Sequence, residues 1–134
     1  MIVLDSSVLI GIVRVEGDAT RLADVLAAEE CVIGAPTLVE ARAWCSINLA
    51  ERSSRWLKRF VDTEAAIVPF NREMADEASN AFAKFGKGSG HPARLNFGDC
   101  LAYAVAMVMR APLLFKGSDF GLTDVTVHPA SIQL

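Results

Sequence analysis

The sequence predicts an α/β fold, a three-layer α/β/α sandwich around a central, mainly parallel sheet. Short, fully apolar runs suited to buried strands alternate with longer segments of helical periodicity, the pattern of parallel strands covered by helices on both faces. The chain has 134 residues, 52% of them hydrophobic, which is enough for one packed core. It contains no internal repeat and no interdomain linker, so we expect a single domain over residues 1–134.

Five segments are expected to form strands. The first, residues 1–5, is an apolar run that ends in a carboxylate. The others are the short apolar runs at residues 31–35, 66–69, 113–115 and 125–127. In an open parallel sheet, ligands bind beyond the carboxyl ends of the strands. Polar residues that follow these strands are therefore candidates for a functional site.

Helices are expected between these strands. Ser6 or Ser7 can cap the first, and Gly17 can close it. The second, third and fourth cover residues 19–30, 36–47 and 51–61, with Pro36 suited to a first helical turn. Asn71 caps a fifth helix that runs to residue 85, and a glycine-rich loop at residues 86–92 precedes the last, at residues 98–109.

The overall composition limits the classes of function. A formal net charge of −3 argues against nucleic-acid binding through an overall positive surface, so any such binding would be local. The longest apolar run, residues 101–109, is half the length of a membrane-spanning helix, and no basic signal-peptide region opens the chain. We therefore expect a cytoplasmic protein without membrane contact. Cys31, Cys45 and Cys100 match neither a disulfide framework nor a metal site and are expected to be buried.

Four carboxylates lie near the predicted carboxyl-end edge of the sheet. Asp5 ends the first strand, and Glu40 lies in the helix after the second. Asp99 opens the helix before the fourth strand, and Asp119 follows that strand. Each has an ordinary explanation as a helix cap, a solvated helix residue or a turn residue. Four at one edge are harder to explain separately, and together they predict an acidic site.

These residue types favour a divalent cation at this edge. The apolar neighbours of Glu40 predict partial burial, and a buried carboxylate without a partner is costly. Oxygen ligands favour Mg²⁺ or Mn²⁺, and no His or Cys cluster indicates zinc. Because Asp99 lies near a helix N-terminus, the helix dipole is expected to keep it ionised. A cation held by carboxylates can activate water and offset charge on a phosphate, which is the chemistry of phosphodiester hydrolysis.

Four short segments carry a more specific signal. They read Val-Leu-Asp-Ser-Ser at residues 3–7, Leu-Val-Glu-Ala at 38–41, Leu-Asn-Phe-Gly-Asp-Cys-Leu-Ala-Tyr-Ala at 95–104 and Leu-Phe-Lys-Gly-Ser-Asp-Phe at 114–120. In these segments the sequence resembles the PIN-domain family and, within it, the VapC toxins. The segments occur in the family's order and span nearly the whole chain, and the Asn-x-Gly-Asp-Cys and Gly-x-Asp-Phe elements are the specific ones.

The resemblance implies a PIN-like fold and a magnesium-dependent endoribonuclease, the toxin of a type II toxin–antitoxin pair. It implies that the catalytic and metal-binding cluster consists of Asp5, Glu40, Asp99 and Asp119, with Asp5 and Asp99 foremost as magnesium ligands. Mn²⁺ is the expected substitute for Mg²⁺.

Short polar side chains near this cluster are candidates for orienting the carboxylates and water. Ser6, Asn96 and Ser118 are of this kind, and helix capping or turn formation is their other explanation. Asp124 could join Asp119, or substitute for it, in contacts with the groups that surround the metal ligands, or it could occupy a surface turn.

The resemblance also implies an RNA substrate, such as tRNA or another structured RNA that is cut in a single-stranded loop. Lys84, Lys87, Arg94 and Lys116 flank the glycine-rich loop and the acidic edge, where they could bind phosphates. A solvated surface explains the same residues. His91 in the loop could donate a proton or be incidental.

Two partners are implied as well. VapC toxins pair with a small VapB antitoxin whose C-terminal segment wraps the toxin, and they commonly form homodimers. Trp44, Trp56, Leu57 and Phe60, on two neighbouring helices, could form an apolar groove for such a segment, and core packing explains them equally.

Other functions fit these residues less well. A receiver domain needs paired acids near the N-terminus, and a haloacid-dehalogenase phosphatase needs a second Asp where this chain has Ser7. A non-catalytic PIN scaffold that binds RNA or protein should have lost one or more acids, whereas all four positions are filled. A PIN nuclease of RNA processing without an antitoxin stays open. An adjacent small gene for a DNA-binding antitoxin would distinguish it from a toxin.

Overall fold

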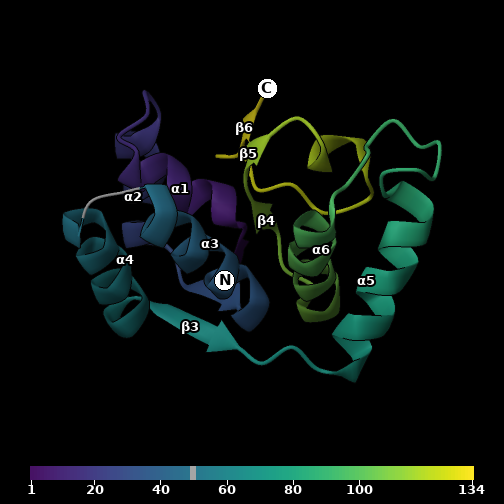
Figure 1. The fold of residues 1–134 in the computed structure, drawn as a ribbon, viewed down its shortest axis with the longest axis horizontal. Helices are drawn as coiled ribbons and strands as arrows, with labels where there is room; N and C mark the ends of the chain where they lie inside the picture. Colours follow the sequence, from purple (N-terminus) through teal and green to yellow (C-terminus); the bar gives the residue numbers. More distant parts are fainter. Residues whose placement is uncertain (49–50) are drawn as a thin grey trace.

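The computed structural model describes residues 1–48 and 51–134, in which six α-helices flank the larger of two sheets and the smaller sheet lies near the C-terminus (Figure 1). The helices are α1 (Ser6–Val13), α2 (Ala19–Ala28), α3 (Ala35–Asn48), α4 (Glu51–Thr63), α5 (Arg72–Phe85) and α6 (Phe97–Met109). The strands are β1 (Ile2–Leu4), β2 (Cys31–Gly34), β3 (Ala65–Val68), β4 (Leu113–Leu114), β5 (Lys116–Gly117) and β6 (Ile132–Gln133), and a 3-10 helix, η1, covers Phe120–Leu122. Every helix in this part of the chain is too short or too polar to cross a membrane.

The larger sheet has the strand order β3-β2-β1-β4, and every neighbouring pair in it is parallel. On β1, Val3 pairs with Val32 on one side and with Leu113 on the other. Strands β5 and β6 form a second, two-stranded parallel sheet. Because the four strands run the same way, their carboxyl ends open on one edge, and Asp5 directly follows β1 at that edge.

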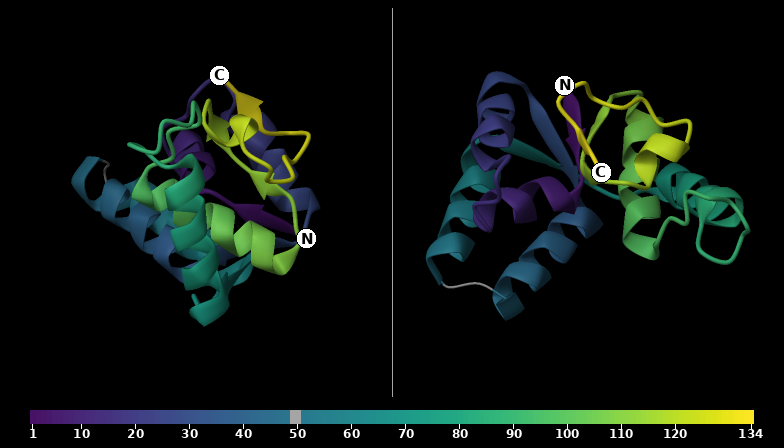
Figure 2. Two further views of the ribbon diagram at one scale, coloured as in Figure 1. Left: turned by 90° about the vertical axis from the view of Figure 1, so that its right-hand side faces the viewer. Right: turned by 90° about the horizontal axis from the view of Figure 1, so that it is seen from above.

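Side chains of β1 alternate between two cores. Ile2 and Leu4 pack with α1 to α4 on one face, whereas Val3 packs with α5 and α6 on the other. Figure 2 shows these two groups of helices on opposite sides of the sheet. The three-layer α/β/α arrangement with a mainly parallel sheet is therefore confirmed. The three cysteines are buried and free, also as predicted.

Helix α6 lies close against the sheet. A Cβ atom on Gly34, the last residue of β2, would come within 2.8 Å of Cγ2 of Val105. Any side chain at this position would push α6 outward, because buried packing leaves no room for it. The glycine thus brings α6, and with it Asp99 in its first turn, close to the strand ends.

The predicted strand over residues 125–127 is wrong. This segment makes an isolated parallel bridge to Leu113. The carbonyl of Phe115, two residues further along the same edge, instead accepts a hydrogen bond from the backbone of Ile132 in β6. After a turn at residues 128–131, the chain pairs with β5 in the second sheet.

Asp5, rather than Ser6 or Ser7, caps the first helix. Its backbone is extended, and its side chain accepts a hydrogen bond from the backbone N–H of Ser7 at 3.1 Å. The helix also ends at Val13, before the predicted Gly17. The carboxylate that ends β1 thus has a structural function in addition to any chemical one.

Candidate active site

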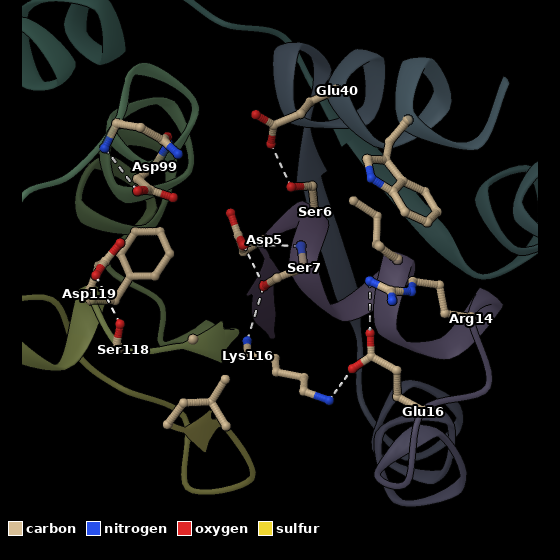
Figure 3. Close-up of a pocket in the computed structure, with 16 residues that line it drawn as sticks. Asp5, Ser6, Ser7, Arg14, Glu16, Glu40, Asp99, Lys116, Ser118 and Asp119 are labelled. Atoms are coloured by element: carbon tan, nitrogen blue, oxygen red, sulfur yellow. Dashed lines mark hydrogen bonds and ion pairs between the residues drawn. The ribbon is translucent and has the colours of Figure 1, made fainter. Parts of the chain in front are cut away.

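Four carboxylates from separate parts of the fold face one pocket at the carboxyl-end edge of the large sheet (Figure 3). Asp5 follows β1, and Glu40 comes from α3. Asp99 comes from the first turn of α6, and Asp119 follows β5. The pocket has a volume of about 490 Å³. The structure therefore brings together the four acids that the sequence singled out.

Asp5 is 5% exposed, and Ser7 satisfies one of its oxygens. The backbone N–H and the hydroxyl of Ser7 donate to Oδ2 at 3.1 and 2.5 Å. The same hydroxyl accepts from the backbone N–H of Lys116 at 3.0 Å, which ties Asp5 to β5. The sequence predicts Ser6 as a residue that orients the acids and Ser7 only as a possible helix cap, so the contact of Ser7 with Asp5 was not predicted. The available signal was the spacing of Asp5 and Ser7, because an Asp side chain often accepts a hydrogen bond from the backbone N–H two residues further along the chain.

Glu40 reaches the pocket across the start of α6. The hydroxyl of Ser6 donates to its Oε1 at 2.5 Å, so Ser6 does contact an acid of the site. A Cβ atom on Gly98 would overlap Oε2 of Glu40, so only glycine leaves room for the carboxylate in this position. The predicted partial burial of Glu40 is wrong, because α3 presents the side chain to solvent at the pocket mouth.

The other two acids are held by neighbouring residues. Asp99 and Asn96 form a capping box in which Oδ1 of Asn96 accepts from the backbone of Asp99 at 2.8 Å. In return, Oδ2 of Asp99 accepts from the backbone of Asn96 at 2.9 Å. The hydroxyl of Ser118 donates to Oδ1 of Asp119 at 3.1 Å. Asn96 and Ser118 thus contact the two acids that they were expected to orient.

Burial and mutual repulsion raise the pKa values of two of these acids. Burial raises the pKa of Asp5 above its ordinary range, and the charge of Glu40 adds to this. Burial also raises the pKa of Asp99 to about 6, to which the charges of Asp5, Asp119 and Glu40 contribute. The helix dipole was expected to keep Asp99 ionised, but burial and the three neighbouring charges outweigh it and raise the pKa.

The donor set fits a hard divalent cation. Neutral hydroxyl and amide groups contact the four acids, and no Lys or Arg of the described chain forms an ion pair with any of them. Carboxylate oxygens are the ligands that Mg²⁺ and Mn²⁺ prefer. Within residues 1–48 and 51–134, no three acidic, His or Cys side chains are already close enough to hold an ion. Ligation therefore requires these side chains to rotate toward one another.

Lys116 lines the pocket, but its ammonium group is already paired. It forms ion pairs with Glu16 and, at 2.8 Å, with Asp18. These pairs raise the pKa of Lys116, so its charge is retained. The predicted phosphate contact would have to compete with two carboxylates.

Arg14 also lines the pocket and was missed by sequence reasoning. Its guanidinium lies over the ring of Trp44, 5.6 Å from the ring centre, and 3.7 Å from Glu16. The helical spacing of Ser7, Ile10 and Arg14, which all line the pocket, was the available signal.

The remaining predicted phosphate ligands lie outside the pocket lining. Lys84 is exposed in the last turn of α5, and Lys87 and Arg94 are exposed on the connection between α5 and α6. His91 is there too: its Nδ1 accepts a backbone hydrogen bond at 3.0 Å, and its ring packs edge-on against Phe85. This placement supports a structural role for His91 in the loop and puts it apart from the four acids.

Asp124 contacts none of the four acids. The hydroxyl of Tyr103 donates to its Oδ1 at 2.6 Å, and Asp124 does not line the pocket. Burial raises the pKa of Tyr103, and this hydrogen bond adds to the effect. Asp124 thus anchors the segment after η1 to α6.

The four residues considered for an apolar groove do not form one surface. Leu57 and Phe60 are buried in the core, and Trp56 stacks on Phe60 with ring centres 5.5 Å apart. Trp44 lines the acidic pocket. Core packing, the other interpretation, accounts for Leu57 and Phe60.

Comparisons with known proteins agree with this architecture. Residues 2–125 match the family model for the PIN domain. Ribonuclease VapC28 of Mycobacterium tuberculosis is 43% identical over 129 residues, which cover 92% of this chain and 94% of the relative. Ribonuclease VapC of Mycolicibacterium smegmatis is 37% identical over 132 residues, which cover 94% and 99%. The chain therefore belongs to the PIN-domain family and, within it, to the VapC proteins.

Solved structures show the same fold at low sequence identity. VapC20 of Mycobacterium tuberculosis, described as a sarcin-ricin loop cleaving toxin, superposes with a TM-score of 0.75 at 13% identity, covering 93% of this chain and 96% of that one. A toxin–antitoxin complex from Klebsiella pneumoniae gives a TM-score of 0.72 at 17% identity, with 98% and 100% covered.

The raised pKa of Asp99 predicts that Asp99→Asn stabilises the protein when no cation is bound. Between the ordinary pKa of 3.8 and the folded value of about 6, the folded protein binds more protons than the unfolded chain. The free energy of unfolding attributable to Asp99 therefore falls as pH rises through this window. In EDTA, calorimetry at about pH 7.5 should give a higher Tm for Asp99→Asn than for the native protein.

The difference should shrink toward pH 4, where Asp99 is protonated in the folded protein. Asp76→Asn, at an exposed position on α5, is the matched control and should show no such gain. An unchanged or lower Tm for Asp99→Asn at about pH 7.5 would contradict the electrostatic account.

Proposed function

We propose that this chain is the endoribonuclease toxin of a VapBC-type toxin–antitoxin pair and that it hydrolyses RNA phosphodiester bonds with Mg²⁺, which Mn²⁺ can replace. The observation that carries the proposal is the set of four acids, without cationic partners among the described residues, around one pocket of a VapC-family chain. Relatives that are 43% and 37% identical are named ribonucleases, which supports the reaction class.

In this proposal, Asp5 and Asp99 hold the cation, with Glu40 and Asp119 as further ligands. The cation, when bound, supplies a water of lowered pKa and offsets negative charge on the phosphate. Its charge would also remove the repulsion that raises the pKa values of Asp5 and Asp99.

The surrounding groups would orient the ligands before any RNA arrives. Ser7 holds one oxygen of Asp5, and Ser6 holds one oxygen of Glu40. The capping box holds one oxygen of Asp99. Glu40 is exposed at the pocket mouth, where it can accept a hydrogen bond from an attacking water.

RNA binding would be local, as the net charge of −3 requires. Arg14 and Lys116 supply the positive charge in the pocket wall. Of the two, we propose Arg14 as the phosphate ligand, because the ammonium group of Lys116 is already paired with two carboxylates. Lys84, Lys87 and Arg94 would contact phosphates further along the strand. A structured RNA such as tRNA, cut in a single-stranded loop, is the proposed substrate class.

A VapB-like antitoxin is the proposed partner, together with a second copy of the chain in a homodimer. The structural neighbour from Klebsiella pneumoniae is a toxin–antitoxin complex, which supports the first of these. A small antitoxin gene beside the gene for this chain would separate a toxin from a PIN nuclease of RNA processing.

Metal-dependent cleavage is the direct prediction. Incubation with total cellular RNA should give discrete new ends in Mg²⁺ or Mn²⁺ and none in EDTA, as mapped by sequencing. Asp99→Asn should abolish the cuts while keeping the fold, because an amide supplies no ligand charge. Cuts that persist in EDTA would point to metal-independent acid–base chemistry, and a fully active Asp99→Asn protein would refute the site assignment.

Gly98→Ala tests the placement of Glu40. The added methyl group overlaps the Glu40 carboxylate and should displace it, and the flexible side chain lets the fold persist. We expect the cleavage rate to fall on the order of 10- to 100-fold, the usual effect of a misplaced ligand environment. Gly11→Ala is the control, because a Cβ atom there meets its nearest neighbours at 3.8 Å. Equal activity of the two variants would show that the position of Glu40 is unimportant.

A further inference from the structure

Phe97, the first residue of α6, projects into solvent beside the acidic pocket. It is 74% exposed, and Val39 of α3 is 64% exposed next to it. Together with Pro36, Thr37 and Leu101 they line a shallow, mainly apolar groove of about 410 Å³ between α3 and α6, which we call the Phe97 groove. An isolated exposed aromatic residue is ordinary, but a ring that forms the wall of a groove requires an explanation.

The Phe97 groove adjoins the acidic pocket. Glu40 lines both of them. Asn96 and Asp99, on either side of Phe97 in the sequence, line the acidic pocket as well. A nucleic acid that presents a phosphodiester to the four acids can therefore place the neighbouring nucleotide in the groove.

The groove offers an aromatic face and aliphatic walls. Phe97 supplies the ring, and Pro36, Val39 and Leu101 supply apolar carbon beside it. Oγ1 of Thr37 is fully buried, 3.8 Å from the position that a Cβ atom on Gly34 would take, so it faces the sheet and is not a ligand in the groove. An exposed aromatic ring between apolar walls matches the flat face of a nucleobase.

We infer that the Phe97 groove binds an unpaired nucleobase of the RNA next to the scissile phosphodiester, with the base stacked on the ring of Phe97. This inference rests on the proposed ribonuclease function. Every base has a π-face, so stacking of this kind tolerates different bases and selects for an unpaired nucleotide. The groove would then explain how the site requires a single-stranded segment without reading its sequence.

The test uses an oligonucleotide that spans one of the cuts mapped in total RNA, and matched copies that are abasic at the nucleotide on either side of the cut. Phe97→Ala should lower kcat/KM on the intact RNA about 5- to 100-fold, the range of one lost base–aromatic stack, and mainly through KM. Phe97→Trp should retain the native value. Ile47→Ala is the control, because Ile47 is 82% exposed on α3 and lines neither the acidic pocket nor the Phe97 groove.

With the native protein, kcat/KM for one of the two abasic substrates should be lower than for the intact RNA by the same factor. On that abasic substrate, Phe97→Ala should cause no further decrease in kcat/KM. If Phe97→Ala lowers kcat/KM on both abasic substrates by as much as on the intact RNA, the inference is overturned. So would a Phe97→Ala protein whose oligomeric state changes by light scattering and whose activity recovers at higher concentration, because the groove would then hold a second copy. A native protein that cuts no RNA in Mg²⁺ would refute the proposed function itself, whatever the groove binds.

Discussion

Repulsion among four carboxylates at one edge of the sheet is the constraint around which the site is built. Asp5 is almost fully buried, yet it also caps α1 and faces the charge of Glu40. The groups that contact the acids are hydroxyls and backbone amides, which fix their positions without neutralising them. The fold therefore keeps a concentration of negative charge that only a cation can offset well.

The sequence was sufficient for the four-stranded sheet and for the grouping of the four acids at one pocket, because the carboxyl ends of parallel strands open on one edge. It was insufficient where tertiary packing decides. The pKa of Asp99 depends on burial and on three charges from distant segments, which outweigh the local dipole. The position of Glu40 depends on the missing side chain of Gly98 in another helix. Likewise, the segment at residues 125–127 has the apolar pattern of a strand, but it makes only an isolated bridge to Leu113. Strand β5 pairs with β6 instead, after a turn that the sequence pattern does not predict.

The start of α6 connects the chemistry to the packing. Gly34 lets the helix lie directly on the sheet, and the capping box fixes its first turn. The same turn carries Asp99 into the pocket and Phe97 out to the neighbouring groove. A single rigid helix end thus sets the distance between the acidic site and the surface where we place a base.

The central claim is that these four acids take up one or more divalent cations, and a crystal soaked in Mn²⁺ tests it most directly. The account predicts an anomalous difference peak inside the pocket, with oxygen ligands that include Asp5 and Asp99, and its loss in Asp99→Asn crystals. Because the ion offsets the repulsion among the carboxylates, the four acidic side chains should move toward it. A fully occupied peak elsewhere, with the pocket residues unchanged at millimolar Mn²⁺, would contradict the claim.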